Sequence, residues 1–431
     1  MTYIKSKYNL LIEKYDEGVL VFNTITTALL LIPHSYWKVD SFVGEFTEDW
    51  KILVEAGIWV ENNTNEYEML HSLLVSKKRI GDDIVNVTIV PTYRCNMKCV
   101  YCFQVDENEI IMNDLLAYRI LEACQLLVSR HKGIQLTWFG GEPLLGLKIM
   151  RIISEGLISF CEKNEKRYFA SLVTNGTLIT DSIADELVKL RISQIQVTLD
   201  GLDHDKTRKM KNGESSYSLI VSNLQKIVDK FTVVLRSNVS TDNIQSIHSM
   251  IDSLMKMDSL RNKVFFSFYP VTGFEGKGAK GEGFCRYMDL PTYSEALCEL
   301  AKHVLKYQSV SFLTNLNISS STIPCEAIYK DTVCFDSYGD VYKCALSMQN
   351  HEVSIGNITN NTIDEILDNG DQNGWLTFVW DSSCQDCVFL PLCHSGCIYR
   401  RRISGERKCT IEKQTCNSLL KVLYEQRNDY K

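Results

Sequence analysis

The sequence has no excess of positive charge. Its 431 residues include 46 lysines and arginines against 53 aspartates and glutamates, which gives a formal net charge of -7. Nucleic acids are bound by basic surfaces that neutralise their phosphates. We therefore expect no nucleic-acid partner, and the short basic runs at residues 77–79 and 400–402 are typical of solvated faces.

Long apolar segments and targeting signals are also missing. The N-terminus lacks the basic region, apolar core and small-residue cleavage site of a secretory signal. The most notable apolar stretch, residues 28–33, is far shorter than the roughly 20 residues that a membrane-crossing helix needs. No internal repeat or low-complexity tract is present. We expect a cytoplasmic protein without a membrane partner.

Cysteine is absent from the first 94 residues, although the chain contains 16 cysteines. Three of them lie at residues 95–102 and nine between residues 325 and 416. In a reducing compartment, thiols serve metal binding or catalysis more often than disulfides. The clustering therefore predicts separate metal sites.

Residues 1–85 are predicted to form a small N-terminal unit. Apolar strands at 8–14 and 19–24 flank the turn Asp16-Glu17-Gly18, which is typical of a β-hairpin. A helix, a strand and a second helix follow, at residues 46–57, 58–61 and 65–78. This order resembles the winged-helix element that recognises leader peptides in ribosomal-peptide maturation. The alternative is an accessory cap that packs on the main domain.

Residues 86–290 alternate between strands and helices, which predicts parallel βα units and an α/β fold. Six such units favour a partial (β/α)6 barrel, in which the chemistry lies at the C-terminal ends of the strands. The predicted strands are 87–92, 134–139, 168–174, 195–199, 231–239 and 264–269, and the predicted helices are 115–130, 147–163, 181–190 and 217–230. Residues 291–324 are a linker region with a helix at 293–307, and the glycine-rich segment 273–283 is either a lid or an idle surface connection.

Cys95, Cys99 and Cys102 form a Cys-x3-Cys-x2-Cys motif directly after the first predicted barrel strand. Three thiolates in one tight loop suit an iron–sulfur cluster in which one iron stays open for an outside ligand. Zinc is the alternative, but structural zinc sites prefer four closed ligands and paired Cys-x2-Cys knuckles.

This motif resembles the signature of radical S-adenosylmethionine (radical SAM) enzymes. The resemblance implies that the open iron of a four-iron cluster binds the methionine amino and carboxylate groups of S-adenosylmethionine. Reductive cleavage then yields a 5′-deoxyadenosyl radical that abstracts a substrate hydrogen. A reductant such as flavodoxin or ferredoxin is the implied electron donor.

Further segments stand where that family contacts its cofactor, at the ends of successive predicted strands. The resemblance implies that the Gly-Gly-Glu-Pro segment receives the methionine amino group and that Tyr101 packs near the adenine. An arginine on the fifth strand can hold a carboxylate through paired hydrogen bonds. The implied cofactor-binding residues are Tyr101, Gly140, Gly141, Glu142, Pro143, Thr174, Asn175, Asp200, Arg236 and Asn238.

The C-terminal third, residues 325–431, carries a second cysteine pattern that resembles the SPASM extension of radical enzymes acting on peptides and proteins. The resemblance implies two auxiliary four-iron clusters, and a hairpin around residues 335–341 would hold Cys334 near Cys344. A zinc ribbon is the alternative for the local spacing. The implied ligands are Cys325, Cys344 and Cys397, with Cys334 as candidate fourth, for the first cluster, and Cys384, Cys387, Cys393 and Cys416 for the second.

Five cysteines lie outside these sets. Cys409 is an alternative to Cys416, whereas Cys124, Cys161 and Cys298 lie in predicted helices and are expected to be small core residues. A fifth, Cys285, follows the glycine-rich segment; burial is the preferred interpretation, with a catalytic thiol as the alternative.

One departure bears on the reaction. Sulfatase-maturing members carry an aspartate directly after the hairpin cysteine, and here that residue is Ala345. We therefore favour a maturase that forms a thioether or carbon–carbon crosslink in a precursor peptide with a leader sequence. The alternatives are formylglycine formation, peptide epimerisation and, in another class, a non-catalytic zinc-binding module that binds peptides.

Overall fold

The computed structural model describes residues 1–43, 47–80, 83–102, 104, 110–271, 288–314, 325–372, 374–375, 380–405 and 409–428. The chain forms two compact units. The first contains Met1–Ile80, Leu316–Ile328 and Thr377–Lys431, and the second contains Gly81–Asn315 and Tyr329–Leu376. Within the described ranges, no helix combines the length and apolar character needed to cross a membrane.

The second unit is built on a sheet whose first six strands are parallel neighbours in the order β14-β13-β11-β10-β9-β7. One face of these strands is buried and most side chains of the other face are partly buried, while residues 233–235 and 266–268 are buried on both faces. The predicted partial barrel is confirmed. The six strands are β7 (Ile84–Ile89), β9 (Gly133–Trp138), β10 (Arg167–Thr174), β11 (Ile192–Thr198), β13 (Thr232–Val239) and β14 (Val264–Pro270).

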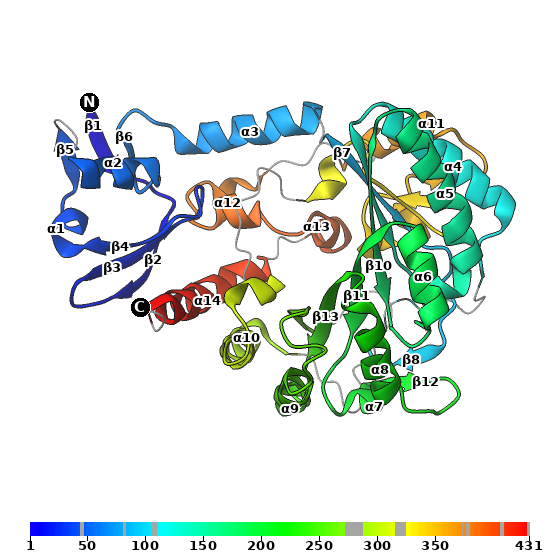
Figure 1. Cartoon of the computed structure of the whole chain (residues 1–431). Helices are drawn as coiled ribbons and strands as arrows, with labels where there is room; N and C mark the ends of the chain where they lie inside the picture. Colours follow the sequence, from blue (N-terminus) through cyan, green and yellow to red (C-terminus); the bar gives the residue numbers. More distant parts are fainter. Residues whose placement is uncertain are drawn as a thin grey trace. The chain divides into compact units, whose positions relative to one another are not determined.

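Helices connect these strands and bury one apolar face each; α4, α5 and α6 cover the outside of the sheet (Figure 1). Asn113 and Thr180 cap α4 and α6 by accepting hydrogen bonds from backbone N–H groups of the first turn. The helices are α4 (Asp114–Ser129), α5 (Leu147–Lys163), α6 (Asp181–Lys189), α7 (His204–Thr207), α8 (Tyr217–Ile227), α9 (Ile244–Met255) and α10 (Leu290–Leu305).

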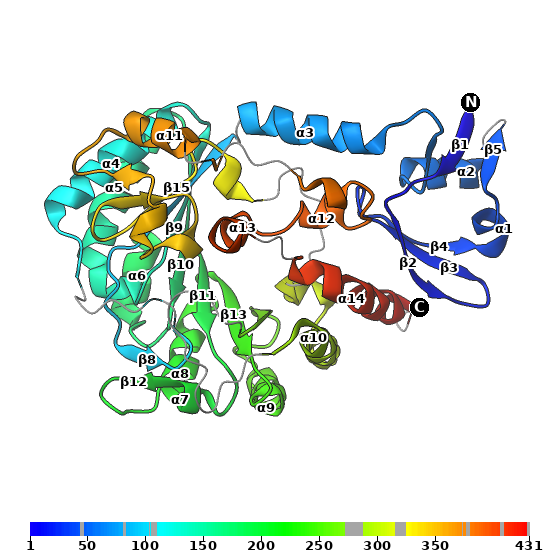
Figure 2. The same cartoon turned by 180° about the vertical axis from the view of Figure 1, so that it is seen from behind.

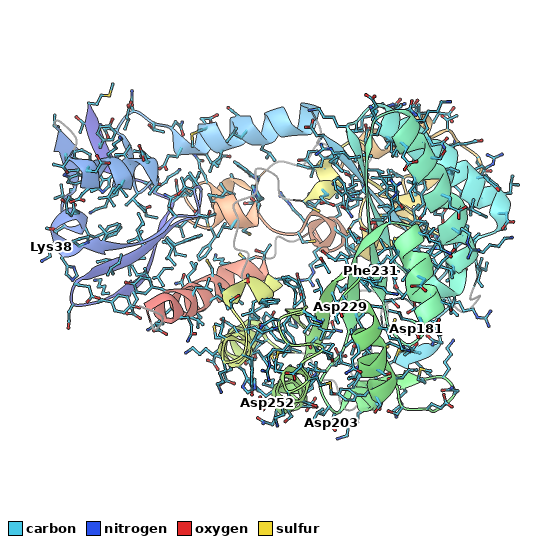
Figure 3. The ribbon with its side chains drawn as sticks, viewed as in Figure 1. Lys38, Asp181, Asp203, Asp229, Phe231 and Asp252 are labelled. Carbon is cyan, nitrogen blue, oxygen red and sulfur yellow. The ribbon has the colours of Figure 1, made fainter. Side chains whose placement is uncertain are left out.

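Helix α9 was not predicted from the sequence, yet the parallel pairing of β13 with β14 requires a crossover there. Asp252 of α9, labelled in Figure 3, accepts hydrogen bonds from His303 and Tyr307 and so ties α9 to α10 and the residues that follow it.

The predicted cysteine-flanked hairpin extends the same sheet. Strand β15 (Val333–Phe335) pairs in parallel with β7 and antiparallel with β16 (Asp340–Tyr342), which in turn pairs with β17 (Gly356–Asn357). The connection Asp336–Gly339 turns through a glycine at φ +85°. Helix α11 (Ile363–Gln372) completes this part of the second unit.

The first unit contains the predicted hairpin, β2 (Asn9–Lys14) and β3 (Gly18–Asn23), to which β4 (Leu29–Pro33) adds a third antiparallel strand. A second small sheet and two helices pack around an aromatic core that includes Trp59 and Tyr3. These elements are β1 (Thr2–Lys5), β5 (Ser41–Val43), β6 (Trp59–Glu61), α1 (His34–Trp37) and α2 (Glu48–Glu55), and the long helix α3 (Glu66–Ile80) follows.

The C-terminal segment belongs to the same compact unit as this N-terminal part. Its helices are α12 (Leu390–Cys393), α13 (Ile398–Ser404) and α14 (Ile411–Asn428). Leu10 and Phe22 of the hairpin pack with Phe389 and Leu420, and Lys421 of α14 pairs with Glu13 of β2. Figure 2 shows α14 beside β2 from behind. Residues about 400 positions apart in sequence therefore share one apolar core.

The predicted segment 273–283 and Cys285 lie outside the described residues. Of the predicted core cysteines, Cys124 and Cys161 are buried in α4 and α5, whereas Cys298 on α10 is only half-buried.

Candidate functional site

The three cysteines of the first motif lie together in the second unit. Their loop contains the short strand β8 (Met97–Cys99), and the Cys102 N–H donates to the Cys99 carbonyl at 3.2 Å. Burial raises the pKa of both the Cys95 and Cys99 thiols to about 11, and burial also raises the pKa of Cys102. The shortness of the loop keeps the three thiols near one another.

Buried thiols with raised pKa values become thiolates only if a positive centre stands beside them. Iron provides that charge, so the donor set fits an iron–sulfur cluster. Asn175 adds a contact from the adjoining strand end, because its Nδ2 lies 3.8 Å from Cys95 Sγ.

The Gly-Gly-Glu-Pro segment follows β9 and packs directly on the backbone before the cysteine loop. A Cβ atom on Gly141 would lie 2.3 Å from the Tyr93 carbonyl oxygen and 2.4 Å from that of Arg94, so only glycine fits. The Gly141 and Glu142 N–H groups donate to the Thr92 and Arg94 carbonyls. This contact fixes the cysteine loop against the end of β9.

Glu142 is fully buried and joins two strand ends. One carboxylate oxygen accepts from the Leu144 N–H at 3.1 Å and from Thr174 Oγ1 at 2.8 Å, and the other accepts from the Asn175 N–H at 2.8 Å. Burial raises the pKa of Glu142, and these hydrogen bonds oppose the rise. The side chain therefore orders the predicted cofactor-binding segment at Thr174 and Asn175.

Tyr101, next to Cys102, is the centre of a partly buried polar network. Its hydroxyl bonds to Asp200 Oδ2 and accepts from Asn238 Nδ2 at 3.0 Å and from Arg208 Nη1 at 3.1 Å. The Asn238 N–H donates to Asp200 Oδ1 at 2.8 Å. The structure thus brings together Tyr101, Asp200 and Asn238, three residues predicted separately from the ends of different segments.

Arg236 lies beside this network. Its Nε donates to Asn238 Oδ1 at 3.2 Å, and its guanidinium stands over the Tyr269 ring at 4.4 Å from the centroid. These contacts orient the side chain that was predicted to hold a carboxylate.

Two residues of the site were missed by sequence reasoning. Arg208 opens β12 (Arg208–Met210), which pairs antiparallel with β8 so that Arg208 stands opposite Cys99. Its buried guanidinium opposes the rise in the pKa values of Cys99 and Asp200 that burial causes. A three-residue strand has no detectable periodicity, so no sequence signal identifies this pairing.

The second missed residue is His204, which is fully buried on α7. Its Nδ1 accepts the Asp200 N–H at 3.1 Å, so the ring supports the backbone of a network residue. Burial lowers the pKa of His204 to about 3, with a further contribution from the positive charge of Arg208. The imidazole therefore stays neutral at physiological pH.

Most of the C-terminal cysteines belong to the first unit. Cys387, Cys393 and Cys416 contribute to one apolar cluster with Leu10 and Phe22, and the Cys387 N–H donates to the Cys384 carbonyl at 3.0 Å. Cys416 is buried, whereas Cys409 is half-buried.

The backbone between Cys393 and Cys397 turns sharply, because all three intervening residues have positive φ: +48° at His394, +68° at Ser395 and +93° at Gly396. Such strain in two non-glycine residues is typical of functional loops. Cys325 also belongs to the first unit, whereas Cys334 and Cys344 belong to the second. Within the described part of the chain, no three cysteine, histidine or carboxylate side chains converge as ligands of a single metal ion.

Comparison with protein families agrees with these motifs. Residues 89–254 match the radical SAM superfamily, and residues 325–388 match SPASM, described as an iron–sulfur cluster-binding domain. A cysteine-type anaerobic sulfatase-maturating enzyme of Clostridium novyi is 26% identical over 325 residues, 70% of this chain and 84% of that protein. A probable GTP 3′,8-cyclase of Methanopyrus kandleri is 28% identical over 200 residues, 45% of this chain and 61% of the cyclase.

Two solved structures share the fold. The enzyme anSMEcpe, with bound AdoMet and Cp18Cys peptide, aligns at a TM-score of 0.63 and 20% identity, covering 80% of this chain and 98% of that one. SuiB of Streptococcus suis, bound to the precursor peptide SuiA, aligns at a TM-score of 0.55 and 17% identity, covering 93% of this chain and 97% of that one. A radical SAM domain binds S-adenosylmethionine at an iron–sulfur cluster, and a SPASM domain implies further clusters. The chain is therefore a radical SAM enzyme that carries a SPASM domain.

Proposed function

We propose that the protein is a maturase that forms a thioether or carbon–carbon crosslink in a ribosomally made precursor peptide. The observation that carries the proposal is at Ala345, where sulfatase-maturing enzymes have an aspartate. Its methyl group packs into an apolar cluster with Val90, Tyr93 and Met348. No carboxylate base stands at this position.

The fold of the N-terminal part supports a peptide substrate. SuiB, which was solved with its precursor peptide, resembles the chain over 93% of its length. The hairpin β2–β3 with its third strand, together with α2 and α3, fits the winged-helix-like element expected to bind the leader. We propose that the leader sequence binds to this element.

The site residues have separate tasks in this proposal. Cys95, Cys99 and Cys102 hold the first cluster, and the cysteine sets predicted from spacing hold two auxiliary clusters in the SPASM region. When bound, these groups supply a 5′-deoxyadenosyl radical for hydrogen abstraction and an acceptor for the remaining electron. Glu142 fixes the strand ends that face the cofactor, and Tyr101 joins the strand ends at Asp200 and Asn238.

Sulfatase-type formylglycine formation is the second candidate, because the Clostridium novyi relative matches 70% of the chain. Mass spectrometry of product peptides separates the two reactions. A crosslink removes two hydrogens per bond, whereas formylglycine formation from cysteine exchanges the thiol for an aldehyde and leaves no new bond between residues.

The first test is anaerobic reconstitution with iron and sulfide, followed by dithionite and S-adenosylmethionine, and chromatography for 5′-deoxyadenosine. The combined variant Cys95→Ala, Cys99→Ala and Cys102→Ala should form none, whereas Cys298→Ala, a change of the same type outside the predicted ligand sets, should keep the activity. Incubation with candidate precursor peptides then assigns the bond. Formylglycine in a sulfatase-type peptide, without any crosslinked product, would reject the maturase proposal.

A further inference from the structure

Tyr8 of the N-terminal part carries a buried hydroxyl that the fold leaves unpaired. The residue precedes β2 and is fully buried. Its phenol oxygen has no hydrogen-bond partner among the residues that the structure describes. Buried tyrosine hydroxyls usually have a hydrogen-bond partner, and leaving one unpaired is unfavourable. The Tyr8 hydroxyl can therefore serve an acceptor that the polypeptide does not supply, if its neighbours place it beside one.

Backbone and side-chain contacts place Tyr8 against the Cys384–Cys387 segment. The preceding residue, Lys7, donates from Nζ to the Gln385 carbonyl at 3.2 Å and to Asp386 at 3.3 Å. On the other side, the Thr24 N–H donates to the Tyr8 carbonyl at 3.0 Å, and the Thr24 hydroxyl lies 2.6 Å from the Val388 carbonyl. The neighbours of Tyr8 thus bind the residues on both sides of Cys387.

The Cys387 thiol is also among the groups that raise the pKa of Tyr8, after burial and the charges of Glu66, Asp386 and Tyr67. Both oxygens of Glu66 are already engaged, by the Ser6 hydroxyl and the Lys7 N–H. Asp386 accepts from the Lys7 ammonium at 3.3 Å, so each nearby carboxylate already has a donor, and the Cys387 sulfur remains as an acceptor for the Tyr8 hydroxyl.

We propose that Tyr8 donates a hydrogen bond from its hydroxyl to the sulfur shell of the second auxiliary cluster, at the Cys387 thiolate or an adjoining sulfide. The inference rests on the second auxiliary cluster proposed above. Tyr8 is then a positioning residue that acts through the cluster. The N-terminal part, in addition to binding a peptide, sets the reduction potential of a cofactor held by the C-terminal cysteines.

The direction of the effect follows from electrostatics. Reduction adds negative charge to the cluster, and a hydrogen bond to sulfur stabilises the reduced form more than the oxidised form. Loss of the bond therefore lowers the potential. A net hydrogen bond is worth about tenfold in the reduction equilibrium, which equals about 59 mV for a one-electron couple.

The test is a redox titration followed by electron paramagnetic resonance, on the full chain in the Cys95→Ala, Cys99→Ala, Cys102→Ala background that removes the first cluster. Tyr8→Phe deletes only the hydroxyl. Tyr15→Phe is the matched control, because its hydroxyl is also buried and unpaired among described residues, while the charges near it are Glu425, Lys421 and Glu13 and no cysteine.

We expect Tyr8→Phe to lower the reduction potential of one auxiliary cluster, which corresponds to a change of about tenfold in its reduction equilibrium. Tyr15→Phe should leave this potential unchanged. An unchanged potential in Tyr8→Phe, with full iron content, would overturn the inference. A Cys384→Ala, Cys387→Ala variant identifies the signal of the second cluster. If that variant loses no iron and no signal, the cluster itself is refuted, which is a different outcome from a silent Tyr8→Phe.

Discussion

Lys343, which precedes Cys344, is a buried cation whose removal should open the SPASM hairpin. The residue is 3% exposed, and its Nζ donates to three backbone carbonyls: Tyr329 at 2.5 Å, Lys330 at 2.9 Å and Thr332 at 2.6 Å. These carbonyls lie in the segment that leads into β15. The ammonium therefore holds this segment against the end of β16.

The Lys343→Met variant keeps the length of the side chain and removes all three donors. Two of the three hydrogen bonds are buried, and a buried carbonyl left unpaired costs about 1–3 kcal/mol. The middle of that range gives about 4 kcal/mol for both. Relief of the desolvated ammonium offsets part of this loss. We expect the free energy of local opening to fall by about 3 kcal/mol.

Hydrogen–deuterium exchange of β15 amides measures that free energy directly. A loss of about 3 kcal/mol accelerates exchange by roughly a hundredfold, since about 1.4 kcal/mol corresponds to tenfold. Lys330→Met is the control, because Lys330 makes an exposed pair with Asp368 at 2.7 Å that is worth about 0–1 kcal/mol. If the β15 amides exchange at the same rate in both variants, the hydrogen bonds of Lys343 do not hold this segment in place.

Three further changes test the site and the fold. Arg208→Gln removes the positive charge beside buried Asp200 and should lower the free energy of unfolding of the second unit by about 3–5 kcal/mol, measured by thermal unfolding. Lys209→Gln, a change at the exposed neighbouring residue, should leave the stability near that of the wild type. Gly141→Ala forces a Cβ to within 2.4 Å of two carbonyls and should abolish first-cluster iron in an iron assay, unlike Gly370→Ala, whose nearest contact is 3.3 Å. His131 bonds to Asp331 at 2.8 Å and lowers the pKa of the Asp331 carboxyl. The stabilisation of the fold by this pair is therefore present above the unfolded pKa of about 3.9 and is lost as the pH falls through the lower folded pKa. In urea titrations, the advantage of the wild type over Asp331→Asn should therefore disappear only below about pH 4; a constant difference down to pH 2 would contradict this.

The sequence was most informative where local pattern and burial agree. All six barrel strands were predicted to within about three residues at each end, because buried parallel strands are short apolar runs between turn signals. The start of β7 at Ile84 and the helix α9 show the limit of this approach. The cysteine loop and the Asp200 and Asn238 strand ends were found from motif spacing, and the structure joins them through Tyr101.

Other features depend on contacts between residues far apart in the sequence, which no local sequence pattern reveals. Arg208 reaches the cysteine loop through a pairing of three residues with three, which is too short for any period to be visible. Tyr8 becomes notable only because Lys7 and Thr24 bond to residues on both sides of Cys387, which is far away in the sequence. The same is true of Lys343, whose three acceptors are backbone atoms and therefore independent of side-chain identity.

The strand β3 explains why the N-terminal part and the C-terminal cysteine segment form one compact unit. All six of its residues are buried, so both faces need an apolar cover. Val19 and Val21 face the aromatic core around Trp59, whereas Phe22 packs with Phe389 and Leu420. Without the C-terminal segment, the Phe22 face would lie open to water. The element proposed to bind the leader therefore packs against the cysteine segment proposed to hold the second auxiliary cluster. A change in packing on one face of β3 is thereby transmitted to the apolar cluster on its other face.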